Sequence, residues 1–62
     1  MNLKLKMKIL EKNLKQWDVS QAVGISDSHL SKIIHQQRTP DLKTKESIAR
    51  VLQCEVSEIF SE

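Results

Sequence analysis

The sequence predicts an all-α protein, and three of its features carry that prediction. Apolar residues recur at three- and four-residue intervals, the spacing that places them on one face of an α-helix. One glycine and one proline are too few for the many tight turns of a β-sandwich or β-barrel. A single cysteine excludes an internal disulfide, so the 62 residues have to fold around one small hydrophobic core. We therefore expect a single domain over residues 1–62.

Capping residues and apolar spacing predict five helices. They span residues 3–12, 16–23, 27–35, 42–52 and 56–61. Asn13 can take the left-handed conformation that ends the first helix, and Gly24 ends the second. Ser26 and Asp41 are good N-caps for the third and fourth helices. The fifth helix is only about one and a half turns long, so packing rather than helix propensity has to hold it.

The first segment, Leu3–Leu10, leaves two interpretations open. Its sequence LKLKMKIL alternates apolar and basic residues as a half-buried strand does, although Leu, Lys and Met favour helices. A helix here would be apolar on two opposite faces, with Leu5 and Ile9 on one and Leu3, Met7 and Leu10 on the other. We expect such a helix to be sandwiched between the second and third helices on one face and the fourth and fifth on the other. The alternative is a strand over residues 3–8 ahead of a shorter helix.

Charge and hydropathy narrow the class of function. Residues 1–40 contain seven Lys/Arg against three Asp/Glu, while residues 41–62 contain three against five. A basic first part fits a nucleic-acid-binding surface, although on charge alone a solvated helix surface is the simpler explanation. No apolar run approaches the roughly 20 residues of a membrane span, and we expect a cytoplasmic protein without membrane contact. No Cys/His cluster has the spacing of a zinc site, and no cofactor is expected.

The most informative stretch, Gln16–His35, predicts two short helices joined by a tight turn. Val19 and Val23 share one face of the first helix, and Leu30 and Ile33 share one face of the second. The second helix is therefore apolar on one side and polar on the other. It is short enough to enter a major groove about 12 Å wide. The outward side chains are Asp27, Ser28, Ser31 and Lys32.

This stretch resembles the helix-turn-helix of the phage lambda repressor and Cro superfamily. The residues that match its pattern are Gln16, Val19, Ser20, Val23, Gly24, Ile25, Leu30 and Ile33. The segment TPDLKTKESIARVLQCEVSEIF is similar to the fourth and fifth helices of the all-helical branch, so the resemblance implies a five-helix lambda-repressor-like domain. The sequence departs from the family pattern at three positions. Lys15 replaces the usual Ser or Thr cap, Ser20 replaces the usual Ala, and Gln36 replaces the common Gly after the recognition helix, so this exit needs another turn or a left-handed Gln. Asp18 in the first turn can partly compensate for the missing cap through the helix dipole.

The resemblance implies sequence-specific binding of double-stranded DNA and no enzymatic activity. Base-reading roles are expected for Asp27, Ser28 and Lys32. Contacts to the DNA backbone, or mixed contacts, are expected from Gln16, His29, Ser31, Gln37, Arg38 and Lys43. For Asp27 two roles stay open, because its carboxylate can accept a hydrogen bond from cytosine N4 or stabilise the helix through its dipole. The contiguous Ser26 to His29 cannot form a hydrolase triad, because one helical turn does not allow that geometry.

We expect a transcriptional repressor of phage or mobile-element type that binds a palindromic operator as a homodimer, without a small-molecule ligand. A DNA-binding antitoxin or a restriction-modification controller is the close alternative, and a protein-interaction adaptor on the same fold is the alternative from another class. Relatives often dimerise through the last helices. Apolar residues near the two ends favour a weak dimer here, namely Leu3, Met7, Ile59 and Phe60.

At two positions where many relatives carry an Arg–Glu ion pair, this sequence has Ile9 and Ile34. An apolar pair avoids the desolvation cost of buried charges, so we expect these two side chains to pack together. The alternative is that Ile34 is exposed and marks a protein interface. We expect Trp17 to be a partly buried packing residue, with a position near the DNA backbone as the alternative. We expect Cys54 to be an inert buried thiol rather than a redox sensor.

Overall fold

The computed structural model describes residues 1–60, most of which lie in five helices. These are α1 (Leu3–Glu11), α2 (Gln16–Val23), α3 (Asp27–Ile34), α4 (Leu42–Val51) and α5 (Val56–Ile59). The part of the chain that the structure describes contains no strand, so the alternative of a strand over residues 3–8 is wrong. The expected helices are confirmed, with most ends one or two residues earlier than predicted. Residue 61, which we placed in the last helix, lies outside the described residues.

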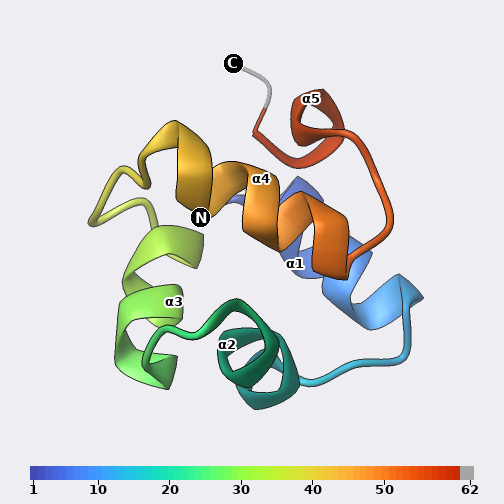
Figure 1. Cartoon of the computed structure of the whole chain (residues 1–62), viewed down its shortest axis with the longest axis horizontal. Coiled ribbons are helices and arrows are strands. Elements are labelled where there is room, and N and C mark those ends of the chain that lie inside the picture. Colours follow the sequence, from blue (N-terminus) through green and yellow to red (C-terminus); the bar gives the residue numbers. More distant parts are fainter. Residues whose placement is uncertain (61–62) are drawn as a thin grey trace.

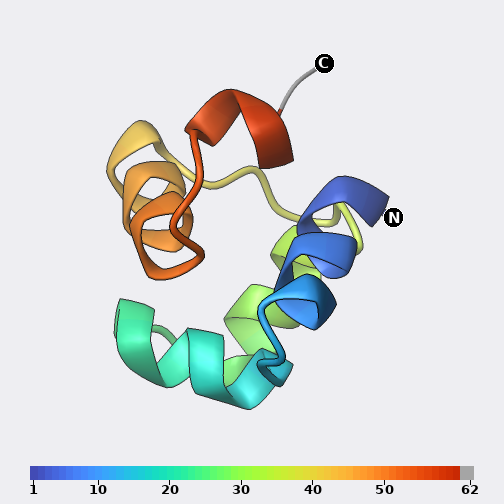
Figure 2. The same cartoon turned by 90° about the vertical axis from the view of Figure 1, so that its right-hand side faces the viewer.

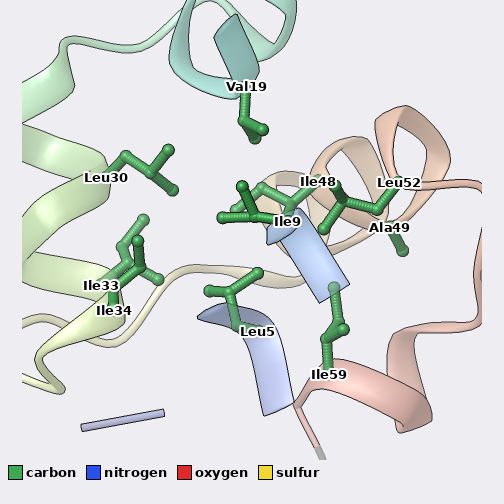
Figure 3. Packing of buried hydrophobic residues seen from close by; sticks show 10 residues of the cluster. All are labelled: Leu5, Ile9, Val19, Leu30, Ile33, Ile34, Ile48, Ala49, Leu52 and Ile59. Atoms are coloured by element: carbon green, nitrogen blue, oxygen red, sulfur yellow. The ribbon is translucent and has the colours of Figure 1, made fainter. Parts of the chain in front are cut away.

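All five helices contribute to one hydrophobic core. Helix α2 packs against α3 and α4, while α1 packs against α5 and α3, and α4 packs against α5 (Figure 1). Figure 3 shows how the core side chains converge from these helices. The buried residues are Leu5, Ile9, Val19, Leu30, Ile33, Ile34, Ile48, Ala49, Leu52 and Ile59. Ile9 and Ile34 are 4% and 2% exposed, so the alternative of an exposed Ile34 is wrong.

The sandwich that we expected around α1 is not formed. Leu5 and Ile9 are buried, but Leu3, Met7 and Leu10 on the opposite face are all exposed. Figure 2 shows why: α1 runs along one edge of the molecule and α4 lies at the other. Helices α3 and α5 both pack against α1, and the core that they share with it holds Leu5 and Ile9. The core therefore covers only one face of α1.

The apolar residues at the other end of the chain are also placed differently from our expectation. Ile59 is buried in the core, and Phe60 packs half-buried against it. The ammonium of Lys45 lies 5.6 Å from the centre of the Phe60 ring, within range of a cation–π interaction. The exposed apolar surface near the ends is therefore concentrated on α1 rather than shared with α5.

Asn2 joins three parts of the fold. Its side chain accepts a hydrogen bond from the N–H of Leu5 at 3.1 Å and so caps α1. The same amide group donates to the carbonyl of Ile59 at 2.7 Å. The backbone N–H of Asn2 donates to the carbonyl of Ile34, also at 2.7 Å. The start of α1 is thereby fixed to the ends of α3 and α5.

Three helices end at a left-handed residue that is not glycine. These residues are Asn13 after α1, Gln36 after α3 and Gln53 after α4, with φ values of 59°, 60° and 55°. At the end of α3, the N–H of Gln36 donates to the carbonyl of Ile33 and that of Gln37 to Lys32, which is the pattern of a Schellman motif. The expected left-handed Asn13 is confirmed, and Gln36 takes the left-handed conformation rather than another turn, whereas Gln53 was not anticipated.

Candidate nucleic-acid interface

Helices α2 and α3 cross at a tight turn that positions the outward face of α3. The turn residue Gly24 has a φ of 88°, a backbone conformation that residues with side chains rarely adopt, so this position favours glycine. Val19 and Leu30 are fully buried where the two helices pack. Ser20 is also fully buried, and its hydroxyl donates to the carbonyl of Trp17 at 2.8 Å. Serine therefore fills the position of the usual alanine without leaving its hydroxyl unpaired.

The polar residues expected to read DNA do lie together on the outward side of α3. Asp27, Ser28 and Lys32 are exposed, and His29 and Ser31 are half-buried beside them. The buried side of the same helix carries Leu30, Ile33 and Ile34. An eight-residue helix with this division can present its polar side to a groove while its apolar side stays in the core.

A hydrogen bond between the first residues of α2 and α3 links the two helices. The side-chain amide of Gln16 donates to the Oδ1 atom and to the backbone carbonyl of Asp27, both at 3.3 Å. Ser26 already caps α3 by accepting from the N–H of His29 at 3.0 Å. The carboxylate of Asp27 is therefore oriented by Gln16 rather than used as the cap. The sequence placed both residues on the DNA side but gave no signal that they contact each other.

The missing cap of α2 is partly replaced by Asp18. Lys15 occupies the N-cap position, and its backbone N–H donates to Oδ2 of Asp18 at 2.9 Å. This is the reciprocal half of a capping box. We expected Asp18 to compensate partly for the missing cap through the helix dipole. The structure adds a direct hydrogen bond, which fixes the first turn of α2 and hence Gln16. Trp17 on this turn is 60% exposed, so our expectation of a partly buried packing residue is wrong.

The loop that follows α3 carries basic groups around a hollow of about 180 Å³. Arg38 and Lys45 line this hollow together with Gln36 and Thr39. The amino terminus is close by, since its ammonium donates to Oε1 of Gln36 at 3.1 Å. Gln37, Arg38 and Lys43 are exposed, as the expected backbone contacts require. Sequence reasoning missed Lys45 and the amino terminus, because only the fold brings them to this loop.

The carboxyl of Asp41 and the thiol of Cys54 have shifted pKa values. Asp41 caps α4, and hydrogen bonds from Thr44, with the N–H at 2.9 Å from Oδ1, lower the pKa of its carboxyl. Partial burial, and secondarily the charge of Glu58, raise the pKa of the Cys54 thiol. Cys54 packs half-buried against the core, so it is less buried than the core position that we expected for it.

Within residues 1–60, none of the helices has the length and hydrophobicity that crossing a lipid bilayer requires. A family model described as Helix-turn-helix matches residues 3–59, which include all five helices. No significant match was found among curated proteins or among solved structures. With the five-helix architecture and the α2–α3 turn, the match identifies the chain as a DNA-binding protein of the lambda repressor/Cro-type helix-turn-helix family.

Proposed function

We propose that this protein is a sequence-specific transcriptional repressor that inserts α3 into the major groove of double-stranded DNA. The observation that carries this proposal is the outward face of α3, where Asp27, Ser28 and Lys32 are exposed together. The hydrogen bond from Gln16 holds the start of this face against α2. A rigid polar face of this kind suits hydrogen bonding to base edges.

Each of the three base-reading residues has a matching partner in the major groove. Lys32 can donate to the O6 and N7 acceptors of guanine, and Ser28 can donate or accept. Asp27 can accept from the N4 amino group of cytosine. We favour this role for Asp27 over a purely structural one, because Ser26 already caps the helix. The amide of Gln16 also leaves the second carboxylate oxygen available to a base.

The remaining residues surround the reading face and are proposed to hold the DNA backbone. Gln16 contributes from the start of α2, and the exposed cations contribute by neutralising phosphates. Arg38 is the strongest candidate of these, and Lys45 joins it across the hollow. The full set of proposed backbone or mixed contacts is Gln16, His29, Ser31, Gln37, Arg38, Lys43 and Lys45.

We propose that the protein is a repressor of phage or mobile-element type and that it binds a palindromic operator as a homodimer. The eight residues of α3 span about 12 Å, enough for only three to four base pairs. Two copies with half-sites about 34 Å apart would read a longer and more selective site. An antitoxin or restriction-modification controller would use the same surface.

Selection of binding sites from a random duplex pool tests this function. We expect a palindromic consensus whose affinity falls as the salt concentration rises, because phosphate contacts release counterions. Recovery of duplexes that share no consensus, together with no salt-sensitive binding to any duplex, would instead favour a protein-interaction adaptor. Gel shifts with the selected site and a scrambled duplex complete the comparison.

A further inference from the structure

The outward face of α1 carries a stripe of large apolar side chains that the fold does not use. Leu3, Met7 and Leu10 are 61%, 63% and 66% exposed. They are spaced four and three residues apart, so they form one line along the helix. This line lies opposite the buried Leu5 and Ile9, which already join α1 to the core. An apolar line with helical spacing is the usual contact surface for another helix.

The stripe leads into a hollow between the end of α1 and the start of α2. This hollow has a volume of about 260 Å³ and includes Leu10 of the stripe. Its other apolar lining comes from Ile9, Leu14 and Ile34. A concave apolar site next to an apolar ridge can accept a large side chain from a partner, as hot-spot pockets in interfaces do.

Positive charge surrounds this surface. Lys6 and Lys15 line the hollow, and Lys12 is exposed at the end of α1. The acidic residue of α1, Glu11, lies 3.7 Å from the ammonium of Lys8. It therefore offsets the charge of Lys8 rather than the charges of the lysines beside the hollow. A second copy docked face to face would bring these lysines against their own counterparts.

We propose that the stripe of Leu3, Met7 and Leu10 and the adjoining hollow bind an amphipathic helix of another protein that carries acidic residues. The apolar side chains of the partner helix lie along the stripe and insert one member into the hollow. Its Asp or Glu residues flank them and meet Lys6 and Lys15. None of the three stripe residues belongs to the reading face, so the proposal does not depend on DNA binding. Gln16, which also lines the hollow, is the one residue that this site shares with the proposed DNA contacts.

Panning a displayed library of random peptides of about 16 residues, roughly four helical turns, against the full chain provides the probe. We expect enriched peptides with apolar residues at helical spacing and several Asp or Glu. The most enriched peptide is then synthesised, and its affinity is measured by fluorescence anisotropy. Leu10→Gln and Met7→Gln should each weaken binding by about tenfold or more. Lys6→Glu should weaken it by up to about fivefold, and less so at high salt.

Matched substitutions elsewhere serve as controls. Leu42 is also 66% exposed but lies on α4, so Leu42→Gln should leave peptide affinity unchanged. Arg50→Glu reverses a charge on α4, away from the hollow, and should have little effect. Circular dichroism checks that every variant is folded, and the absence of DNA from the assay separates this result from the test of the repressor function.

Three results would overturn the proposal. The first is enrichment of peptides without acidic residues, or of peptides that bind the Leu10→Gln and Met7→Gln variants normally. The second is a homodimer in sedimentation velocity that the Leu10→Gln variant abolishes, which would assign the stripe to a second copy. The third is binding to vesicles of phosphatidylcholine and phosphatidylglycerol that the same variant abolishes, which would assign it to a lipid surface.

Discussion

Helices α1 and α3 bury one face each in the same core, yet their outward faces have opposite character. Leu5 and Ile9 anchor α1, and Leu30, Ile33 and Ile34 anchor α3. Beyond these anchors, α3 presents carboxylate, hydroxyl and ammonium groups, whereas α1 presents a line of leucine and methionine flanked by lysines. The core therefore accounts for only one face of either helix.

Because the core covers only one face of each helix, the two outward faces can bind different partners. Hydrogen-bonding groups on α3 suit the base edges of DNA, which present donors and acceptors at fixed positions. Exposed leucine and methionine on α1 make no comparable contact with a base edge and suit an apolar partner. Substitutions on the two faces of each helix should therefore have separable effects.

The largest effect is expected on the buried faces. Ile34→Ala should lower the free energy of unfolding by about 2–5 kcal/mol, because it removes a fully packed side chain and leaves a cavity. Leu10→Gln on the exposed face of α1 should change it by less than about 0.5 kcal/mol. Urea denaturation followed by circular dichroism measures both. A comparable loss for the two variants would break the distinction between the faces.

The same experiment tests whether α1 and α3 are coupled through Ile9 and Ile34. Both side chains are buried and line the same hollow. A double-mutant cycle of Ile9→Ala and Ile34→Ala should therefore give a coupling energy of about 0.5 kcal/mol or more. Simple additivity of the two losses would show that they do not pack on each other.

On the outward face of α3, Lys32→Ala should cost about 1–3 kcal/mol of affinity for the selected site and relax the preference at one base pair per half-site. Arg38→Ala should instead weaken binding to all duplexes alike and reduce the salt slope by about one per subunit. Gel shifts over a series of salt concentrations measure both quantities. If Lys32→Ala lowers the affinity for all duplexes by the same factor, Lys32 contacts phosphate and does not read a base.

Asp27→Asn sharpens the reading role of the same face. Asparagine keeps a side-chain oxygen that can accept from Gln16, but it lacks the charge and offers a different hydrogen-bonding pattern to a base. We expect an altered preference at one symmetric pair of positions with little change in melting temperature. Binding-site selection with the variant provides the measurement. A uniform gain in affinity with an unchanged consensus would leave Asp27 with a structural role only.

A smaller effect is expected where the two helices end. Gln36→Gly should raise the free energy of unfolding by about 1 kcal/mol, because it relieves a left-handed residue that has a side chain. Asn13→Gly after α1 should gain less, since asparagine tolerates this conformation better. Thermal melts compare the two variants. An equal or larger gain at Asn13 would show that the side chain of Gln36, which accepts from the amino terminus, offsets its strain.

The smallest effect concerns the carboxylate of Glu58, which caps α5 and lies near Lys8 of α1. Glu58 accepts from the N–H of Glu55 at 2.7 Å and lies 3.7 Å from the ammonium of Lys8. The hydrogen bond, and secondarily Lys8, hold the pKa of its carboxyl below the usual 4.5. Its contribution to stability is therefore present above pH 4.5 and is lost as the pH falls through the lower folded-state pKa.

Glu58→Gln should accordingly melt slightly below the parent protein at neutral pH and at the same temperature in acid. Melting curves over a pH series measure this convergence, with Glu46→Gln on α4 as the control for a surface carboxylate. A difference that stays constant down to the most acidic pH would show that the charge of Glu58 contributes nothing to stability.

Features that depend on residues close together in the chain could be predicted from the amino-acid sequence alone. Helical spacing of Val19, Leu30 and Ile33 assigned the packed side of the helix-turn-helix, and the turn at Gly24 followed from its conformational freedom. The same spacing placed Asp27, Ser28 and Lys32 on one side of α3. These are consequences of local geometry, because residues three and four apart share a helix face wherever the helix lies.

Which of the two apolar faces of α1 is buried in the core depends on the tertiary packing of the helices. The choice depends on where α4 and α5 come to lie, and the spacing within LKLKMKIL carries no information about that. The same reason explains the contacts that were missed: Asn2 with Ile59, Gln16 with Asp27, and the amino terminus with Gln36. Each joins residues that are distant in the chain, so it exists only once the helices have packed.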